Sequence, residues 1–262
     1  MGKQLYKRFN YLTPIGYIKN SLIYDYDIAK ANINVMKAAG VISDQEYDNF
    51  LIMDKMNREI CIGNMIKKNQ DISKIIKDGI TEAKKELMIS NNIDDDEVVR
   101  IANDSMVIKR EFPLKYTRFK ISEIDHYIEF VNKGMFTTMM NLNGIVLFFI
   151  NQDGSYNVEV KGINDELLYL HEPILRFICD ILSSMERSEK SITLGIFNRF
   201  YEDYVNKKLP MTYYREFNAG SCYRIENAHI GTRILDEKYF DKLDISYNIY
   251  MLRKLYSYIL MT

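Results

Sequence analysis

The chain has no tryptophan, only four prolines, and three cysteines that lie far apart along the sequence. An odd, scattered set of cysteines predicts neither a disulfide framework nor a zinc site. Four prolines and twelve glycines exclude collagen-like and low-complexity structure. No apolar run reaches the roughly 18 residues of a membrane span, and the first residues lack the apolar core of a signal peptide. We therefore expect a cytoplasmic protein without a membrane partner.

The chain also has almost no net charge, because its 35 Lys and Arg residues nearly balance its 36 Asp and Glu residues. A net charge of −1 gives no general attraction to nucleic acid, so phosphate binding needs a local basic surface. The three histidines are isolated from one another, so any metal site would have to use carboxylates. The apolar fraction of 47% is enough for a folded core and excludes intrinsic disorder.

The order of hydrophobic patterns predicts an α+β fold. Strand-like and helix-like segments mix up to residue 163, and mainly helical segments follow. We expect a first domain over 1–163, with helices over about 41–92, and a second, helical region over 164–262. The expected elements are a strand at 21–27, helices at 28–39, 44–68 (broken near Gly63) and 71–90, a hairpin of 98–102 with 106–109, strands at 135–141, 145–151 and 156–160, and helices at 165–185, 191–206 and 244–261.

Two acidic spots are candidates for chemistry. Asp25 and Asp27 lie at the carboxyl end of an apolar strand, and strand alternation points both to one face. Asp104 lies at the tip of the predicted hairpin, between Asn103 and Ser105. Carboxylates on neighbouring strand ends can hold Mg²⁺ together with substrate phosphates. Two such ions stabilise both the attacking and the leaving oxygen of a phosphoryl transfer.

These segments resemble two motifs of family B DNA polymerases. YDYDIAKANINVM (24–36) is similar to motif A, with Asp27 on its metal-binding aspartate. VVRIANDSMVI (98–108) is similar to motif C, with Asp104 on its second aspartate. The resemblance implies a palm-like antiparallel sheet backed by helices, minimal helical fingers and a thumb-like C-terminal region. It also implies Mg²⁺ or Mn²⁺ bound by Asp27 and Asp104, with the Ile28 carbonyl as a further ligand. Asp25 could fill the place of the missing third carboxylate.

The sequence departs from the family at several positions. Ala102 stands where motif C has its first aspartate. Asn32 replaces the tyrosine that blocks a ribose 2′-hydroxyl, which puts sugar discrimination in doubt. The fingers motif Lys-x-x-x-Asn-Ser-x-Tyr-Gly is missing, and its nearest equivalent is Lys55 with Arg58.

Basic side chains could serve nucleotide or nucleic-acid binding. Lys55 and Arg58 share a helix face and, with Lys67 and Asn32, could hold a nucleoside triphosphate. A solvated helix face with internal ion pairs explains the same pattern. The segment 109–120 joins basic and aromatic residues, which suits single-stranded nucleic acid, although a protected edge strand explains it equally well. The candidate nucleic-acid contacts in this segment are Lys109, Lys115 and Arg118. Lys161 is a fourth candidate, because residues 158–163 resemble the Lys-Gly element that follows the palm in the polymerase family.

The leading hypothesis is a small polymerase or nucleotidyltransferase that adds nucleotides to a 3′-hydroxyl, with DNA as the expected nucleic acid. Fingers this small predict low processivity or dependence on a protein partner. Phage or mobile-element origin would fit, with the host cytoplasm as the compartment. Two alternatives remain: a non-catalytic, polymerase-like binding or assembly subunit, and an unrelated α+β module.

Overall fold

The structure is a computed structural model that describes residues 4–111, 117–152, 155–162, 172–216 and 243–261. The chain divides into two compact units: Met1–Ile15 with Ser21–Met135, and Gly16–Asn20 with Phe136–Thr262. The expected boundary at 163 differs from this division and falls inside the second unit. The difference arises because the strands before 163 share a core with the helices after it.

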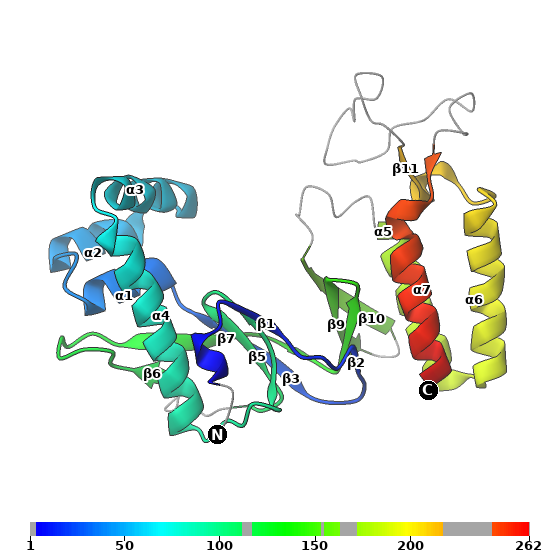
Figure 1. Ribbon diagram of the computed structural model, residues 1–262, viewed down its shortest axis with the longest axis horizontal. Helices are drawn as coiled ribbons and strands as arrows, with labels where there is room; N and C mark the ends of the chain where they lie inside the picture. The colour runs from blue at the N-terminus through cyan, green and yellow to red at the C-terminus, as the bar shows by residue number, and fades with distance from the viewer. Residues whose placement is uncertain (1–3, 112–116, 153–154, 163–171, 217–242, 262) are drawn as a thin grey trace. The chain divides into compact units, whose positions relative to one another are not determined.

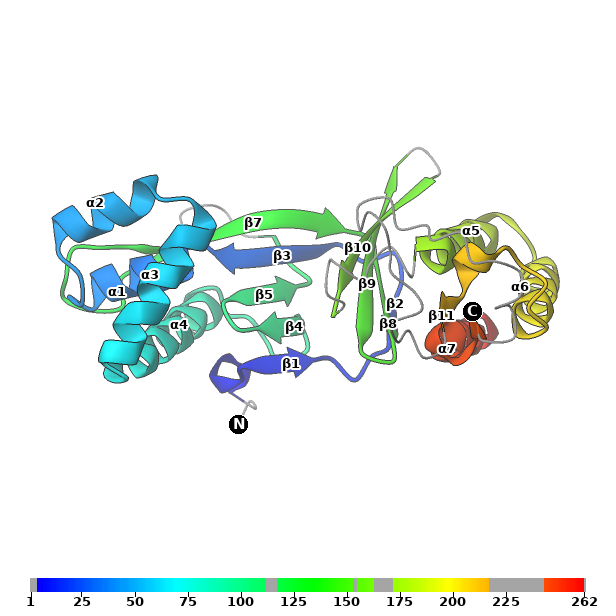
Figure 2. The ribbon, with the colours of Figure 1, turned by 90° about the horizontal axis from the view of Figure 1, so that it is seen from above.

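The first unit is built on a six-stranded sheet of order β1-β4-β5-β3-β7-β6. The strand pairs for which a register is known are all antiparallel. Figure 2 shows β1, β4, β5, β3 and β7 side by side. The strands are β1 (Asn10–Leu12), β3 (Ile23–Ile28), β4 (Val98–Ala102), β5 (Ser105–Ile108), β6 (Arg118–Phe119) and β7 (Ile128–Phe136).

Among the described residues of this unit, four helices and a short 3₁₀ helix accompany the sheet. Their apolar residues form one core with Tyr24, Tyr26 and Ile28 of β3. In α4 the buried residues Ile72, Ile76, Ile80, Ala83 and Leu87 recur at helical spacing, so one face of the helix packs inward. The elements are η1 (Leu5–Lys7), α1 (Ala31–Ala38), α2 (Asp44–Ile52), α3 (Lys55–Lys68) and α4 (Asp71–Ser90).

The helix expected over 44–68 is two helices, and the break is not at Gly63. Asp54 lies between the two and caps the second, because its side chain accepts a hydrogen bond of 3.0 Å from the amide of Asn57. Gly63 lies inside α3 without interrupting it. The capping box at the start of α2 is present: Glu46 Oε2 accepts from the Ser43 amide at 2.8 Å, and Ser43 Oγ accepts from the Glu46 amide at 3.2 Å.

The second unit contains an antiparallel sheet of order β10-β9-β8-β2 and three long helices that share its core (Figure 1). Its strands are β2 (Tyr17–Ile18), β8 (Thr138–Leu142), β9 (Ile145–Gln152) and β10 (Ser155–Lys161). Its helices are α5 (Glu172–Arg187), α6 (Lys190–Val205) and α7 (Ser246–Met261). Its described residues also include a 3₁₀ turn η4 (Met211–Tyr213) and a small ladder of β11 (Arg215–Glu216) with β12 (Leu243–Asp244).

The α+β class with antiparallel sheets, helices and a C-terminal helix is therefore confirmed. Within the described residues, no helix is both long and apolar enough to cross a membrane. The expected turn at residues 153–154 lies outside the described residues.

Candidate functional site

The two acidic spots come from neighbouring strands of the first sheet. β3 pairs antiparallel with β5, and this register sets Asp27 opposite Ser105. The next backbone contact along the ladder is a hydrogen bond of 3.2 Å from the Ile28 amide to the Asp104 carbonyl oxygen. Asp27 and Asp104 thus lie on adjacent segments at one end of the sheet.

The hairpin tip that carries Asp104 is formed by Asn103 and Asp104. Asn103 has φ 49°, a left-handed conformation that asparagine tolerates better than most residues. Its amide donates to the carbonyl of Phe9 at 2.8 Å, which fixes the tip to the N-terminal segment. Figure 2 shows the carboxyl end of β3 and the β4–β5 turn directed toward α3 and α4.

Asp25 and Asp27 lie on the sheet face opposite the helical core. Tyr24, Tyr26 and Ile28 belong to that core, so alternation along β3 directs the two aspartates to the other face. Asp25 is 4% exposed, whereas Asp27 is half-buried. Of the two, Asp27 has the more exposed side chain.

Asp104 has an unusual electrostatic environment. Burial raises the pKa of its carboxyl group above the ordinary value, and the negative charge of Glu59 adds to this increase. A hydrogen bond to its own backbone and the positive charges of Lys84 and Lys55 act in the opposite direction and lower it. A carboxyl group whose charged form is disfavoured gains from a bound cation, and such groups are common at functional sites.

Lys84 of α4 is the main site residue that the sequence did not indicate. It is 2% exposed, and its ammonium group donates to the carbonyl oxygens of Arg8 at 2.9 Å and Asn103 at 3.0 Å. Burial lowers its pKa to about 8, against an opposing effect of Asp104. A signal was present, because Lys84 lies four residues from both Ile80 and Met88 and so falls within the apolar stripe of α4.

The predicted nucleotide-binding residues are brought together only in part. Asn32 Nδ2 donates to Glu59 Oε2 at 3.0 Å. The charge of Glu59 raises the pKa of Asp104 and the charge of Lys55 lowers it, so both side chains lie near this carboxyl group. Glu59 was missed because a carboxylate is not expected beside a triphosphate. Arg58 is half-buried on the same helix. Lys67 is exposed twelve residues beyond Lys55, which places it about 18 Å further along the helix axis, away from this group.

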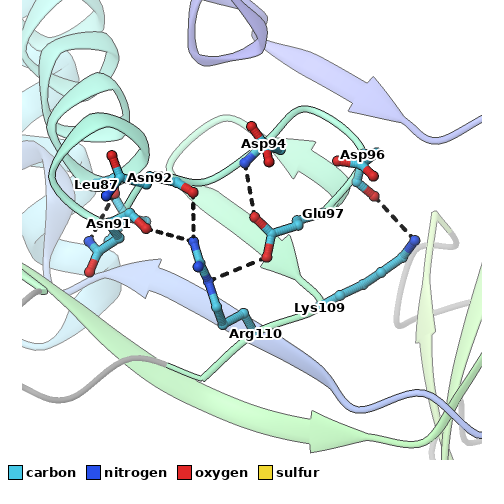
Figure 3. A network of polar contacts seen from close by, with 8 residues as sticks. All are labelled: Leu87, Asn91, Asn92, Asp94, Asp96, Glu97, Lys109 and Arg110. Carbon is cyan, nitrogen blue, oxygen red and sulfur yellow. Dashed lines mark hydrogen bonds and ion pairs between the residues drawn. The ribbon is translucent and has the colours of Figure 1, made fainter.

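The predicted nucleic-acid contacts are scattered. Lys109 lies at the far end of the hairpin, where its ammonium group donates to the Asp96 carbonyl at 3.1 Å (Figure 3). Arg118 lies over the ring of Tyr127 at 5.0 Å, a cation–π contact. Lys161 belongs to the second unit and pairs with Glu159. Lys115 lies outside the described residues.

Figure 3 also shows what holds the far end of the hairpin. Arg110 donates to the carbonyl oxygens of the two residues that follow α4, Asn91 at 2.6 Å and Asn92 at 3.0 Å. Its guanidinium group lies 3.3 Å from Glu97 Oε1. Arg110 therefore has a structural role, joining the end of α4 to the hairpin.

The donor set is small for a metal. In the part of the chain that is described, no group of three or more His, Cys, Asp or Glu side chains is placed to hold an ion. Two carboxylates still fit Mg²⁺, which commonly keeps several waters and takes one or two carboxylates plus substrate phosphates. Asp27 and Asp104 lie on adjacent strand ends, and Asp25 and the Ile28 carbonyl are the other predicted ligands.

Comparison with known proteins gives a family but no activity. No curated protein matches this chain. A family model described as bacteriophage PBS1 gene 130 protein matches residues 1–260, and the chain therefore belongs to this phage protein family.

Proposed function

We propose that the first unit is a nucleotidyltransferase that extends a nucleic acid at its 3′-hydroxyl. The observation that carries the proposal is the pairing of β3 with β5, which sets Asp27 and Asp104 on adjacent strand ends. Two aspartates on neighbouring strand ends of an antiparallel sheet are what the resemblance to a polymerase palm requires. A divalent ion on these carboxylates would neutralise charge on the transferred phosphoryl group.

The remaining residues would bind and position the substrate. Lys55, at the start of α3, lies close enough to Asp104 to lower the pKa of its carboxyl group. Lys55 could therefore bind the phosphates of a nucleotide held between the two residues. Arg58 lies one turn further along α3 and would add a second positive charge. Asn32, held by Glu59, would lie beside the sugar. Positioning and electrostatic stabilisation would then supply most of the rate enhancement.

A specific observation favours a second candidate, a non-catalytic nucleic-acid-binding subunit. Ala102 occupies the place of the first motif C aspartate, and the described residues hold no cluster of three acidic or other metal-binding side chains. A polymerase-like sheet that had lost its metal would keep its binding surfaces and lose its reaction.

Primer extension separates the two candidates. Labelled DNA and RNA primers, with and without template, would be incubated with each nucleotide type and Mg²⁺ or Mn²⁺. We expect extension that disappears in Asp27→Asn and Asp104→Asn but persists in Asp96→Asn, an exposed aspartate at the other end of the hairpin. Extension that survives in the two site variants would come from a contaminating enzyme.

A thermal unfolding series tests the metal directly. Ligand that binds only the folded state raises the melting temperature, so millimolar Mn²⁺ should stabilise the wild type and Asp96→Asn. The same ion should leave Asp27→Asn and Asp104→Asn unchanged. If all four proteins respond equally and no primer is extended, the non-catalytic candidate is favoured.

A further inference from the structure

A basic pocket lies beside the hairpin tip in the first unit, and neither Asp27 nor Asp104 is among its lining residues. It has a volume of about 160 Å³. Residues from three segments line it: the N-terminal stretch, α4 and the turn of the hairpin. The lining residues are Lys7, Arg8, Phe9, Lys77, Ile80, Thr81, Lys84 and Asn103.

Positive charge dominates this lining. Four of the lining residues are lysine or arginine, and none of the described lining residues is acidic. Lys7, Arg8 and Lys77 are exposed, whereas the Lys84 ammonium group forms a buried base. Such a concentration of cations around a small pocket, in a chain of net charge −1, attracts anions locally.

The base of the pocket is already ordered. Lys84 is held by the Arg8 and Asn103 carbonyls, and Asn103 in turn donates to the Phe9 carbonyl. An anion entering the pocket would therefore meet an ammonium group whose position is already fixed, which reduces the entropy lost on binding.

Phe9 indicates which anion fits. Its ring is 57% exposed although it belongs to the lining of the pocket. An exposed aromatic ring beside cations is the arrangement that binds single-stranded nucleic acid, with bases stacked on the ring and phosphates on the cations. Inorganic phosphate would use the cations alone.

We propose that this pocket binds a backbone phosphate of single-stranded nucleic acid, with Phe9 stacking on a neighbouring base. The proposal stands apart from the proposed reaction, because neither Asp27 nor Asp104 lines the pocket. Its position at the hairpin turn would bring an unpaired strand to the tip that carries Asp104.

Binding of a fluorescein-labelled oligothymidylate, followed by anisotropy over a salt series, tests the proposal. We expect Arg8→Gln with Lys77→Gln to weaken binding and to reduce the slope of log affinity against log salt by roughly 0.7 for each phosphate that is no longer neutralised. Phe9→Ala should weaken binding by at least roughly fivefold, the lower range for the removal of base stacking. Both changes are at exposed side chains, so the fold should be retained.

Lys74→Gln is the matched control. Lys74 is exposed on the same helix, one turn before Lys77, but does not line the pocket. Equal affinity and equal salt slopes in the wild type, the Arg8/Lys77 double variant and Lys74→Gln would overturn the proposal, as would a wild type that does not bind. If dTTP competes as effectively as unlabelled oligothymidylate, the pocket binds a free nucleotide, and the proposal that it binds single-stranded nucleic acid is overturned. Primer extension is a separate readout, so loss of the reaction in Asp104→Asn with retained binding leaves this proposal standing.

Discussion

The ammonium group of Lys84 donates a hydrogen bond of 3.0 Å to the backbone carbonyl of Asn103, from inside the apolar face of α4. One buried cation thus joins the longest helix of the first unit to the hairpin tip that carries Asp104. The same group also bonds to the Arg8 carbonyl, so three segments far apart in the sequence meet at this point.

Replacing Lys84 by methionine should destabilise the first unit by about 2 kcal/mol. Methionine keeps most of the length of the side chain but leaves two carbonyl oxygens without their charged donor, and an unsatisfied buried group costs about 1–3 kcal/mol. Urea unfolding measures the difference. Lys85→Met is the control, because Lys85 only pairs with Glu82 on the helix surface, where such pairs contribute about 0.3–0.5 kcal/mol. Equal stability of the two variants would contradict the structural role of Lys84.

The contribution of Lys84 should depend on pH. Its pKa is about 8 in the folded protein, against 10.5 as the ordinary value. Between these values the unfolded chain binds more protons, so the free energy of unfolding rises with pH. The stability of the wild type relative to Lys84→Met should therefore increase from pH 8 to pH 10, as urea unfolding at each pH would measure. A difference that stays constant would show that Lys84 has an ordinary pKa.

The elements around the candidate site can be predicted where local signals agree. The sequence predicts the hairpin because Asn103 accepts a left-handed backbone between two apolar runs. It predicts the start of α2 from the Ser43 and Glu46 capping box, which the structure contains. These signals act within a few residues, so one sequence is enough to detect them.

Long-range contacts cannot be predicted in the same way. A lysine in an apolar stripe indicates burial only when its partners are known, and those of Lys84 are carbonyl groups 76 and 19 positions away. The expected division near 163 follows a change from strands to helices, but β8–β10 pack with α5–α7 in a common core. Gly63 is expected to break a helix, whereas capping by Asp54 decides where the break lies.

Arg110→Gln should destabilise the hairpin by about 1–3 kcal/mol. The change removes the ion pair with Glu97 and the charged donor to the carbonyls of Asn91 and Asn92. Hydrogen exchange of the β4 and β5 amides should become faster. Arg118→Gln, which removes an exposed guanidinium from the ring of Tyr127, should leave these amides unchanged. Equal hydrogen-exchange rates of these amides in both variants would show that Arg110 does not stabilise the hairpin.

Two glycines in helices should respond to alanine in opposite directions. A Cβ on Gly79 of α4 would lie 2.3 Å from Val35 Cγ1, so Gly79→Ala should destabilise by about 1–3 kcal/mol through overpacking. A Cβ on Gly63 of α3 would meet no atom within 4 Å. Gly63→Ala should therefore stabilise by about 0.5–1 kcal/mol, the gain in helix propensity. Thermal unfolding of the pair checks both signs, and a stabilising Gly79→Ala would mean that α1 and α4 are more loosely packed.

Asn32 gives a prediction that depends on the proposed reaction. Its amide donates to Glu59 Oε2, and the side chain is too small to exclude a ribose 2′-hydroxyl. Rejection of a slightly larger substrate requires a steric clash or an unpaired polar group, and Asn32 supplies neither. Primer extension should therefore proceed at comparable rates with ribonucleotides and deoxyribonucleotides. Asn32→Tyr should introduce a preference for deoxyribonucleotides, whereas Asn32→Ala, which also removes the bond to Glu59, should not. Strong rejection of ribonucleotides by the wild type would show that another residue selects the sugar.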